Sequence, residues 1–201
     1  IPEIMAAIEN ATPENPVVLG VLSQDATSAS VVGRTVGFLN KAKEVIEKIH
    51  PGGVAITGHD KYNEDSEKET VVELHVQVPP TTDIQDAQTT AQVMLEKKGL
   101  ISMFLSNEAA VAGVLSATSD GQELNKENGK YKDLVVIGFD AGENQKNAVR
   151  NGWFYGSVTQ DPYMIGYYAV ELAVKAINGE DIPELVDTGC QFYTAENMDD
   201  P

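Results

Sequence analysis

Short apolar runs alternate with helix-like segments along most of this chain, and this alternation limits the fold more than any other feature. Apolar runs bounded by turn-forming residues predict strands at residues 17–22, 53–57, 71–78, 101–106, 134–139 and 156–159. Helical patterns lie between several of them, at residues 31–49, 83–97, 108–117, 145–151 and 163–178. The sequence therefore predicts an α/β fold, a three-layer parallel sheet with helices on both faces.

Residues 134–139 are apolar throughout, which is typical of a central parallel strand that is buried on both faces. By contrast, residues 58–69 are polar and charged, and residues 118–132 are rich in Asn, Asp, Gly and Lys. We expect both polar segments to form surface loops.

Charge and composition exclude several classes of function. The chain has 31 acidic and 14 basic residues, so its net charge of -17 would repel a nucleic-acid backbone, and we expect no nucleic-acid partner. No window approaches the roughly 20 apolar residues of a membrane span, and the first residues lack the features of a signal peptide, so a signal segment is absent from the chain as given. One cysteine and three scattered histidines predict no internal disulfide, no metal site and no cofactor.

Polar side chains follow three of the predicted strands, where parallel sheets place their ligands. They are Asn107, Asp140 and Gln160. The amide of Asn107 can donate and accept hydrogen bonds, and the carboxylate of Asp140 can accept from two hydroxyls, which suits a sugar. Each of these two residues also stands where a helix begins, and Asp140 with Glu143 resembles a capping box, so a helix-capping role is the competing interpretation.

Arg34 lies near the start of the predicted helix at residues 31–49. Its guanidinium could donate several hydrogen bonds to ring and hydroxyl oxygens, although a solvated ion pair is the more common role for such a residue. No nucleophile motif, glycine-rich phosphate loop or zinc-protease histidine pair is present, so we predict a binding protein and not an enzyme.

Several motifs together resemble the type I periplasmic sugar-binding proteins of the ribose- and galactose-binding type. They are FLSNEA at 104–109, VVIGFDAG at 135–142, AVRNG at 148–152, GSVTQDPYMIG at 156–166, and the segments at 187–189 and 197–199. The resemblance implies that Asn107, Asp140 and Gln160 hydrogen-bond the sugar and that Arg34, four residues before Phe38, is the family's sugar-binding arginine. Two departures, Thr82 in place of a stacking aromatic residue and an insertion near residues 50–70, affect the identity of the sugar.

The resemblance also implies a division of the chain. Residues 1–160 correspond to the C-terminal lobe, residues 161–185 to a return helix that packs on an N-terminal lobe missing from this chain, and residues 186–201 to the last hinge crossing and tail. The return helix would expose an apolar stripe. We therefore expect either a separate N-terminal piece as a partner or a homodimer, formed directly or by swapping, through the helix at 163–178.

The function implied is that of the sugar-binding component of an ABC importer, which holds a monosaccharide or similar polyol between two lobes and delivers it to a membrane permease. A chemoreceptor is a second partner of that class. The implied location is periplasmic or, for a lipoprotein, extracellular. The alternative is the effector-binding domain of a lactose-repressor-family transcription regulator, because that family shares many of these motifs. A small α/β enzyme or phospho-receiver that uses Asp140 as an acceptor is disfavoured because the expected acidic cluster and lysine are not evident.

Overall fold

The structure is a computed structural model that describes residues 1–199. Its strands are β1 (Val17–Leu22), β2 (Val54–Thr57), β3 (Val72–Gln77), β4 (Leu100–Leu105), β5 (Val135–Phe139), β6 (Gly156–Gln160) and β7 (Cys190–Tyr193). Its helices are α1 (Pro2–Glu9), α2 (Ala29–Ile46), α3 (Ile84–Leu95), α4 (Glu108–Ala117), α5 (Glu143–Arg150) and α6 (Pro162–Ile177), with a 3₁₀ turn at Gln122–Leu124.

All seven strands form one sheet in the order β2-β3-β1-β4-β5-β6-β7. Every neighbouring pair is parallel except β6 and β7, which run antiparallel. From β1 the chain first runs to β2 and β3 on one side and then returns to β4 on the other side. The strand order thus reverses at β1 and β4, and in open α/β sheets the crevice for a ligand lies at such a reversal, beyond the carboxyl ends of the strands.

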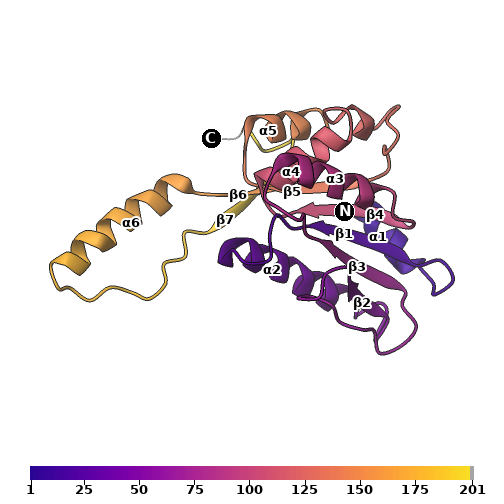
Figure 1. Cartoon of the computed structure of the whole chain (residues 1–201), viewed down its shortest axis with the longest axis horizontal. Coiled ribbons are helices and arrows are strands. Elements are labelled where there is room, and N and C mark those ends of the chain that lie inside the picture. The colour runs from indigo at the N-terminus through magenta and orange to yellow at the C-terminus, as the bar shows by residue number, and fades with distance from the viewer. Residues whose placement is uncertain (200–201) are drawn as a thin grey trace.

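Helices cover both faces of the sheet, which confirms the predicted three-layer α/β fold (Figure 1). One apolar core lies under α3, α4 and α5, and the second lies under α1 and α2. Helices α3 and α4 pack closely, because a Cβ atom added to Gly113 would lie 2.7 Å from Cβ of Ala87. A residue with a side chain at position 113 would force these helices apart.

The prediction that residues 134–139 form the strand buried on both faces is wrong in detail. β1 has that role, since all its residues are buried, whereas residues in β5 are alternately buried and half-buried. Val136 belongs to the core under α3 to α5, while Ile137 and Phe139 only flank the core under α1 and α2. The α1–α2 layer leaves this part of β5 half-covered.

Two edge elements complete the sheet. The segment near residues 50–70 contributes β2, an edge strand parallel to β3, followed by a loop in which Glu64 bridges back to Ile56. At the other edge, the segment at 190–193 forms β7 and pairs with β6 over its whole length. This segment lies in the part of the chain predicted to be the last hinge crossing and tail, where no strand was predicted.

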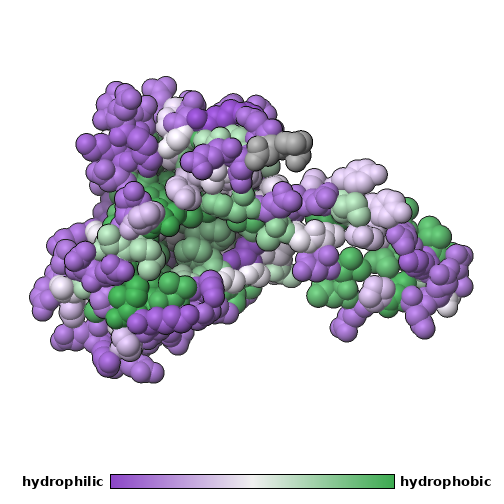
Figure 2. Space-filling model, turned by 180° about the vertical axis from the view of Figure 1, so that it is seen from behind, coloured by the Kyte–Doolittle hydropathy of each residue, from purple (hydrophilic) through white to green (hydrophobic). Residues whose placement is uncertain are grey.

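The segment from α6 to residue 189 forms an arm that stands away from the sheet and its helices (Figure 1). No residue of α6 is buried, and Tyr163, Val170 and Ile177 are 75%, 67% and 85% exposed. Figure 2 shows hydrophobic side chains gathered on this arm. Within residues 1–199, no helix combines the length and the apolar character needed to cross a bilayer.

Candidate functional site

Arg34 is the centre of a hydrogen-bonded cluster at the carboxyl edge of the sheet. From the second turn of α2, its Nη1 donates to the carbonyl oxygen of Ser106 at 3.0 Å, and its Nη2 donates to Oε1 of Gln160 at 2.8 Å. Nη1 also lies 3.4 Å from Oδ1 of Asp140, and the guanidinium covers the ring of Phe139 at 3.8 Å. The side chain of Arg34 is only 14% exposed, so it is held against the ends of β4, β5 and β6.

Asp140 follows β5 and has a left-handed backbone, with φ of +82°. Its amide donates to the carbonyl oxygen of Val158, and its own carbonyl accepts from the hydroxyls of Ser157 and Tyr193, so β6 and β7 hold it in this conformation. Oδ2 of Asp140 accepts from the backbone N–H of Glu108 at 3.0 Å. Oδ1 therefore remains the better placed oxygen for a ligand.

The capping-box interpretation of Asp140 is wrong. Helix α5 begins after Gly142 without a side-chain cap, and the carboxylate of Asp140 turns instead toward the first residue of α4. The capping interpretation of Asn107 is confirmed, because its Oδ1 accepts from the backbone N–H of Ala110 at 3.1 Å. The Nδ2 group of Asn107 donates one hydrogen to Gln24 and keeps the other, so capping and ligand contact are compatible there.

The structure thus brings Arg34, Asp140 and Gln160 into direct contact, and Asn107 lies beside them because its neighbour Glu108 binds Asp140. The cluster contains one guanidinium and one carboxylate, which balance in charge. A neutral molecule with many hydroxyl groups suits such a cluster better than an anion or a cation, since each charge already has its counter-ion.

Sequence reasoning missed two residues of this cluster, Gln24 and Ser106. Ser106 is fully buried; its hydroxyl accepts from the N–H of Gln24 at 3.0 Å, and its carbonyl accepts from Arg34. The side chain of Gln24 accepts from Nδ2 of Asn107. Gln24 lies two residues past β1, so the rule that selected Asn107 after β4 would also have selected Gln24.

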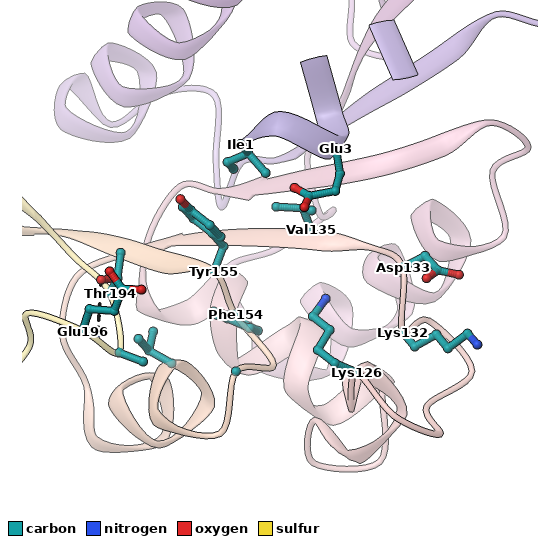
Figure 3. A pocket seen from close by; sticks show the side chains of 13 residues that line it. Ile1, Glu3, Lys126, Lys132, Asp133, Val135, Phe154, Tyr155, Thr194 and Glu196 are labelled. Carbon is teal, nitrogen blue, oxygen red and sulfur yellow. Dashed lines mark hydrogen bonds between the residues drawn. The ribbon is translucent and has the colours of Figure 1, made fainter. Parts of the chain in front are cut away.

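A hollow of about 530 Å³ lies at the amino end of β5 and does not include the cluster around Arg34 (Figure 3). The hollow is lined by Ile1, Glu3 of α1, Tyr155, and Thr194 and Glu196 after β7, together with the residues around Asp133. Burial lowers the pKa of the Lys126 amine there, and this amine donates to the carbonyl oxygen of Leu134 at 2.7 Å. None of the residues selected by sequence lines this hollow.

Glu73 belongs to a separate polar cluster on β2 and β3. Its carboxylate lies 3.0 Å from Nδ1 of His75 and 3.0 Å from Nζ of Lys97, and it accepts from the hydroxyl of Thr57. These contacts, the His75 hydrogen bond foremost, lower its pKa to about 2. Across residues 1–199, no set of three or more His, Cys, Asp or Glu side chains is arranged to hold a metal ion.

Comparison with known families decides the affiliation of the chain. Residues 3–181 match the model of a periplasmic binding protein domain. The chain belongs to the periplasmic binding protein family. This periplasmic binding protein shares 33% sequence identity and a TM-score of 0.79 with a Brachyspira murdochii protein described as an ABC transporter, LacI family transcriptional regulator, over 100% of this chain and 58% of that one. The predicted family resemblance and fold are confirmed.

Two further solved structures share the fold of this periplasmic binding protein. One is a carbohydrate transporter solute-binding protein from Agrobacterium radiobacter in complex with D-arabinose, with 20% identity and a TM-score of 0.69 over 99% of this chain and 60% of that one. The other is an ABC transporter solute-binding protein from Agrobacterium vitis with bound D-fucose, with 21% identity and a TM-score of 0.64 over 100% of this chain and 59% of that one. The present chain thus spans about three fifths of the length of these proteins.

Proposed function

We propose that this chain is the sugar-binding C-terminal part of an extracytoplasmic solute-binding protein. That protein holds a monosaccharide or similar polyol and delivers it to the membrane permease of an ABC importer. The observation that carries the proposal is the cluster of Arg34, Asp140, Gln160 and Asn107 at the carboxyl edge of the sheet. The sugars named for two structural neighbours, D-arabinose and D-fucose, support the same ligand class.

The chemistry of the cluster fits this role. Asp140 offers Oδ1 as a charged acceptor, Arg34 offers the guanidinium hydrogens that its three partners do not use, and Gln160 offers Nε2 because its Oε1 is bound to Arg34. Each of these groups is held by another part of the cluster before a ligand arrives. Such preorganisation lowers the entropy cost of binding.

The proposed division of the chain is a lobe at residues 1–160, a return helix at 161–185, and a last hinge crossing and tail at 186–201, of which residues 200–201 lie outside the described part. The exposed apolar side chains of α6 support a partner for this helix. We assign that partner to an N-terminal lobe outside these 201 residues, which would also close over the sugar. One lobe alone leaves the ligand in contact with water, so we expect these 201 residues by themselves to bind sugar weakly.

The oligomeric state of the 201-residue chain tests the assignment of α6. Exposed apolar surface without its partner drives association, so we expect a concentration-dependent dimer by light scattering at micromolar concentration, and a monomer for the full-length gene product. A monomeric 201-residue chain with α6 ordered and solvent-exposed would contradict the assignment.

The family supports a location outside the cytoplasm, and a lipid anchor and a chemoreceptor partner are finer parts of this proposal. A second function, effector binding in a transcription regulator of the lactose-repressor family, has one specific observation in its favour, which is the wording of the Brachyspira murdochii description. The coding sequence upstream of Ile1 separates the two functions. A signal or lipoprotein peptide supports transport, and a helix-turn-helix supports regulation.

A thermal-shift screen of the full-length gene product tests the proposed function. We expect D-arabinose, D-fucose or a related sugar to raise the melting temperature, because a ligand that binds only the folded state stabilises it. The shift should disappear in Asp140→Ala and in Asn107→Ala. A shift that survives both substitutions would place the sugar elsewhere and contradict the proposal.

A further inference from the structure

Two carboxamide side chains meet where the strand order of the sheet reverses. Gln24 follows β1 and Asn107 follows β4, and β1 and β4 are the neighbouring strands at the reversal. Nδ2 of Asn107 donates to Oε1 of Gln24. We propose that Gln24 is a further ligand-contacting residue and that it presents only a hydrogen-bond donor, its Nε2 group, to the ligand. This inference rests on the proposed function.

The backbone of Gln24 is anchored to the same residue that anchors Arg34. Its N–H donates to the hydroxyl of Ser106 at 3.0 Å, and the carbonyl of Ser106 accepts from Arg34 at 3.0 Å. Ser106 is fully buried, and its own N–H donates to the carbonyl of Leu22 at 3.0 Å. Ser106 therefore fixes the positions of both Gln24 and Arg34. The side chain of Gln24 is half-buried.

The first turn of α4 determines which way both carboxamides face. The backbone N–H of Ala110 can only donate, so the atom of Asn107 that faces it must be the oxygen Oδ1. Nδ2 of Asn107 then faces Gln24, and a donor there requires the oxygen Oε1 of Gln24 as its acceptor. The reverse orientation of Gln24 would place two N–H₂ groups against each other. Nε2 of Gln24 is consequently the group left for a ligand.

Because Gln24 offers only a donor, it restricts which chemical groups of a ligand can face it. A donor-only group on the protein selects a ligand oxygen that accepts, such as a ring oxygen or a hydroxyl, and it disfavours a protonated amine, which can only donate. The carboxylate of Asp140 is already paired with Arg34, so an ammonium group beside it would be repelled by the guanidinium. Neutral sugars therefore fit this site, and an amino sugar whose ammonium group would face Gln24 does not.

The orientation of Gln24 is measurable without any ligand. In a long-range HNCO spectrum of the ¹⁵N,¹³C-labelled full-length gene product, scalar coupling across a hydrogen bond connects the donor nitrogen with the acceptor carbonyl carbon. We expect a correlation from Nδ2 of Asn107 to Cδ of Gln24. A correlation from Nε2 of Gln24 to Cγ of Asn107, or a spectrum with neither correlation, overturns the proposed polarity.

Glu and Leu substitutions separate the two ends of the Gln24 carboxamide. Gln24→Glu keeps an acceptor for Asn107 and replaces the Nε2 donor by an oxygen, so the melting temperature should stay within about 2 °C of wild type while the affinity for the sugar falls at least about tenfold. Gln24→Leu should lose both stability and affinity. Gln92→Glu, an exposed residue of α3, is the matched control for the added charge and should change neither.

The outcomes distinguish this inference from the proposed function. Binding by Gln24→Glu within about twofold of wild type overturns the ligand contact and leaves the sugar-binding function intact. Equal losses of melting temperature in Gln24→Glu and Gln24→Leu assign Gln24 a purely structural role and also overturn it. If no neutral sugar binds the wild-type protein, the proposed function fails and the ligand contact fails with it, while the HNCO spectrum still decides the orientation of the carboxamide.

Discussion

Asp140→Asn removes the negative charge of the cluster and replaces the carboxylate by a carboxamide of similar shape. Asn tolerates the left-handed backbone conformation that residue 140 adopts, so the substitution introduces little new strain. Its oxygen must face the N–H of Glu108, which places the new amide nitrogen on the side of Arg34, where Oδ1 of Asp140 now lies. The acceptor available to a ligand is thereby replaced by a donor.

The expected loss follows from the number of hydrogen bonds involved. A hydrogen bond to a charged group contributes about 1.5–3 kcal/mol, and Oδ1 can accept from one or two sugar hydroxyls. We expect a loss of about 3 kcal/mol in binding free energy, which is roughly a hundredfold in Kd. Because Asp140 is 31% exposed and Arg34 only 14%, some stability should also be lost as the guanidinium loses its counter-ion.

Isothermal titration calorimetry of the full-length gene product, with the sugar that gives the largest thermal shift, measures this loss. Asp133→Asn is a matched control, because the exposed Asp133 precedes the same strand at its opposite end and its loss changes the net charge equally. The control should bind within about twofold of wild type. Asp140→Asn binding within threefold of wild type would refute the role given to Asp140.

Three further substitutions test the stability of the lobe. The pKa of Glu73 is lowered from 4.5 to about 2, so its contribution to stability is present above about pH 5 and is lost as the pH falls toward 2. In urea titrations, Glu73→Gln should therefore lower the free energy of unfolding by up to about 3 kcal/mol at pH 7 and by about half of that at pH 3. An equal effect at both pH values would contradict this. In the same assay, Gly113→Ala should lower the free energy of unfolding by about 1–3 kcal/mol, because the added Cβ would collide with Ala87. At Gly152 the space for a Cβ is open but φ is +69°, so Gly152→Ala should lower the free energy of unfolding by only about 1 kcal/mol.

Most of the fold could be predicted because its signals are local. The apolar runs and helical periods gave β1 and α4 with the bounds seen in the structure and the other predicted elements to within a few residues, since a buried strand and an amphipathic helix each impose a pattern on consecutive residues. β7 carries no such pattern. It is an edge strand of four residues that is mostly exposed, and pairing with β6 defines it.

Site residues could be predicted from the sequence only where their position at the end of a single predicted strand was enough to select them. Asn107 and Asp140 follow strands, Gln160 is the last residue of β6, and Arg34 was added through the family resemblance. The contacts of Gln24 with Asn107 and of Asp140 with Glu108 join residues 83 and 32 positions apart, so no local pattern contains them. The hydroxyl of Ser106, which is buried beneath the site, was overlooked for the same reason.

A crystal structure of the full-length gene product with its sugar tests the central claim most directly. We expect sugar oxygens within about 3.2 Å of polar atoms of Arg34, Asn107, Asp140 and Gln160, beyond the carboxyl ends of β4, β5 and β6. A sugar bound elsewhere, for example in the hollow beside Lys126 and Tyr155, with the cluster around Arg34 unchanged and out of contact, would contradict it.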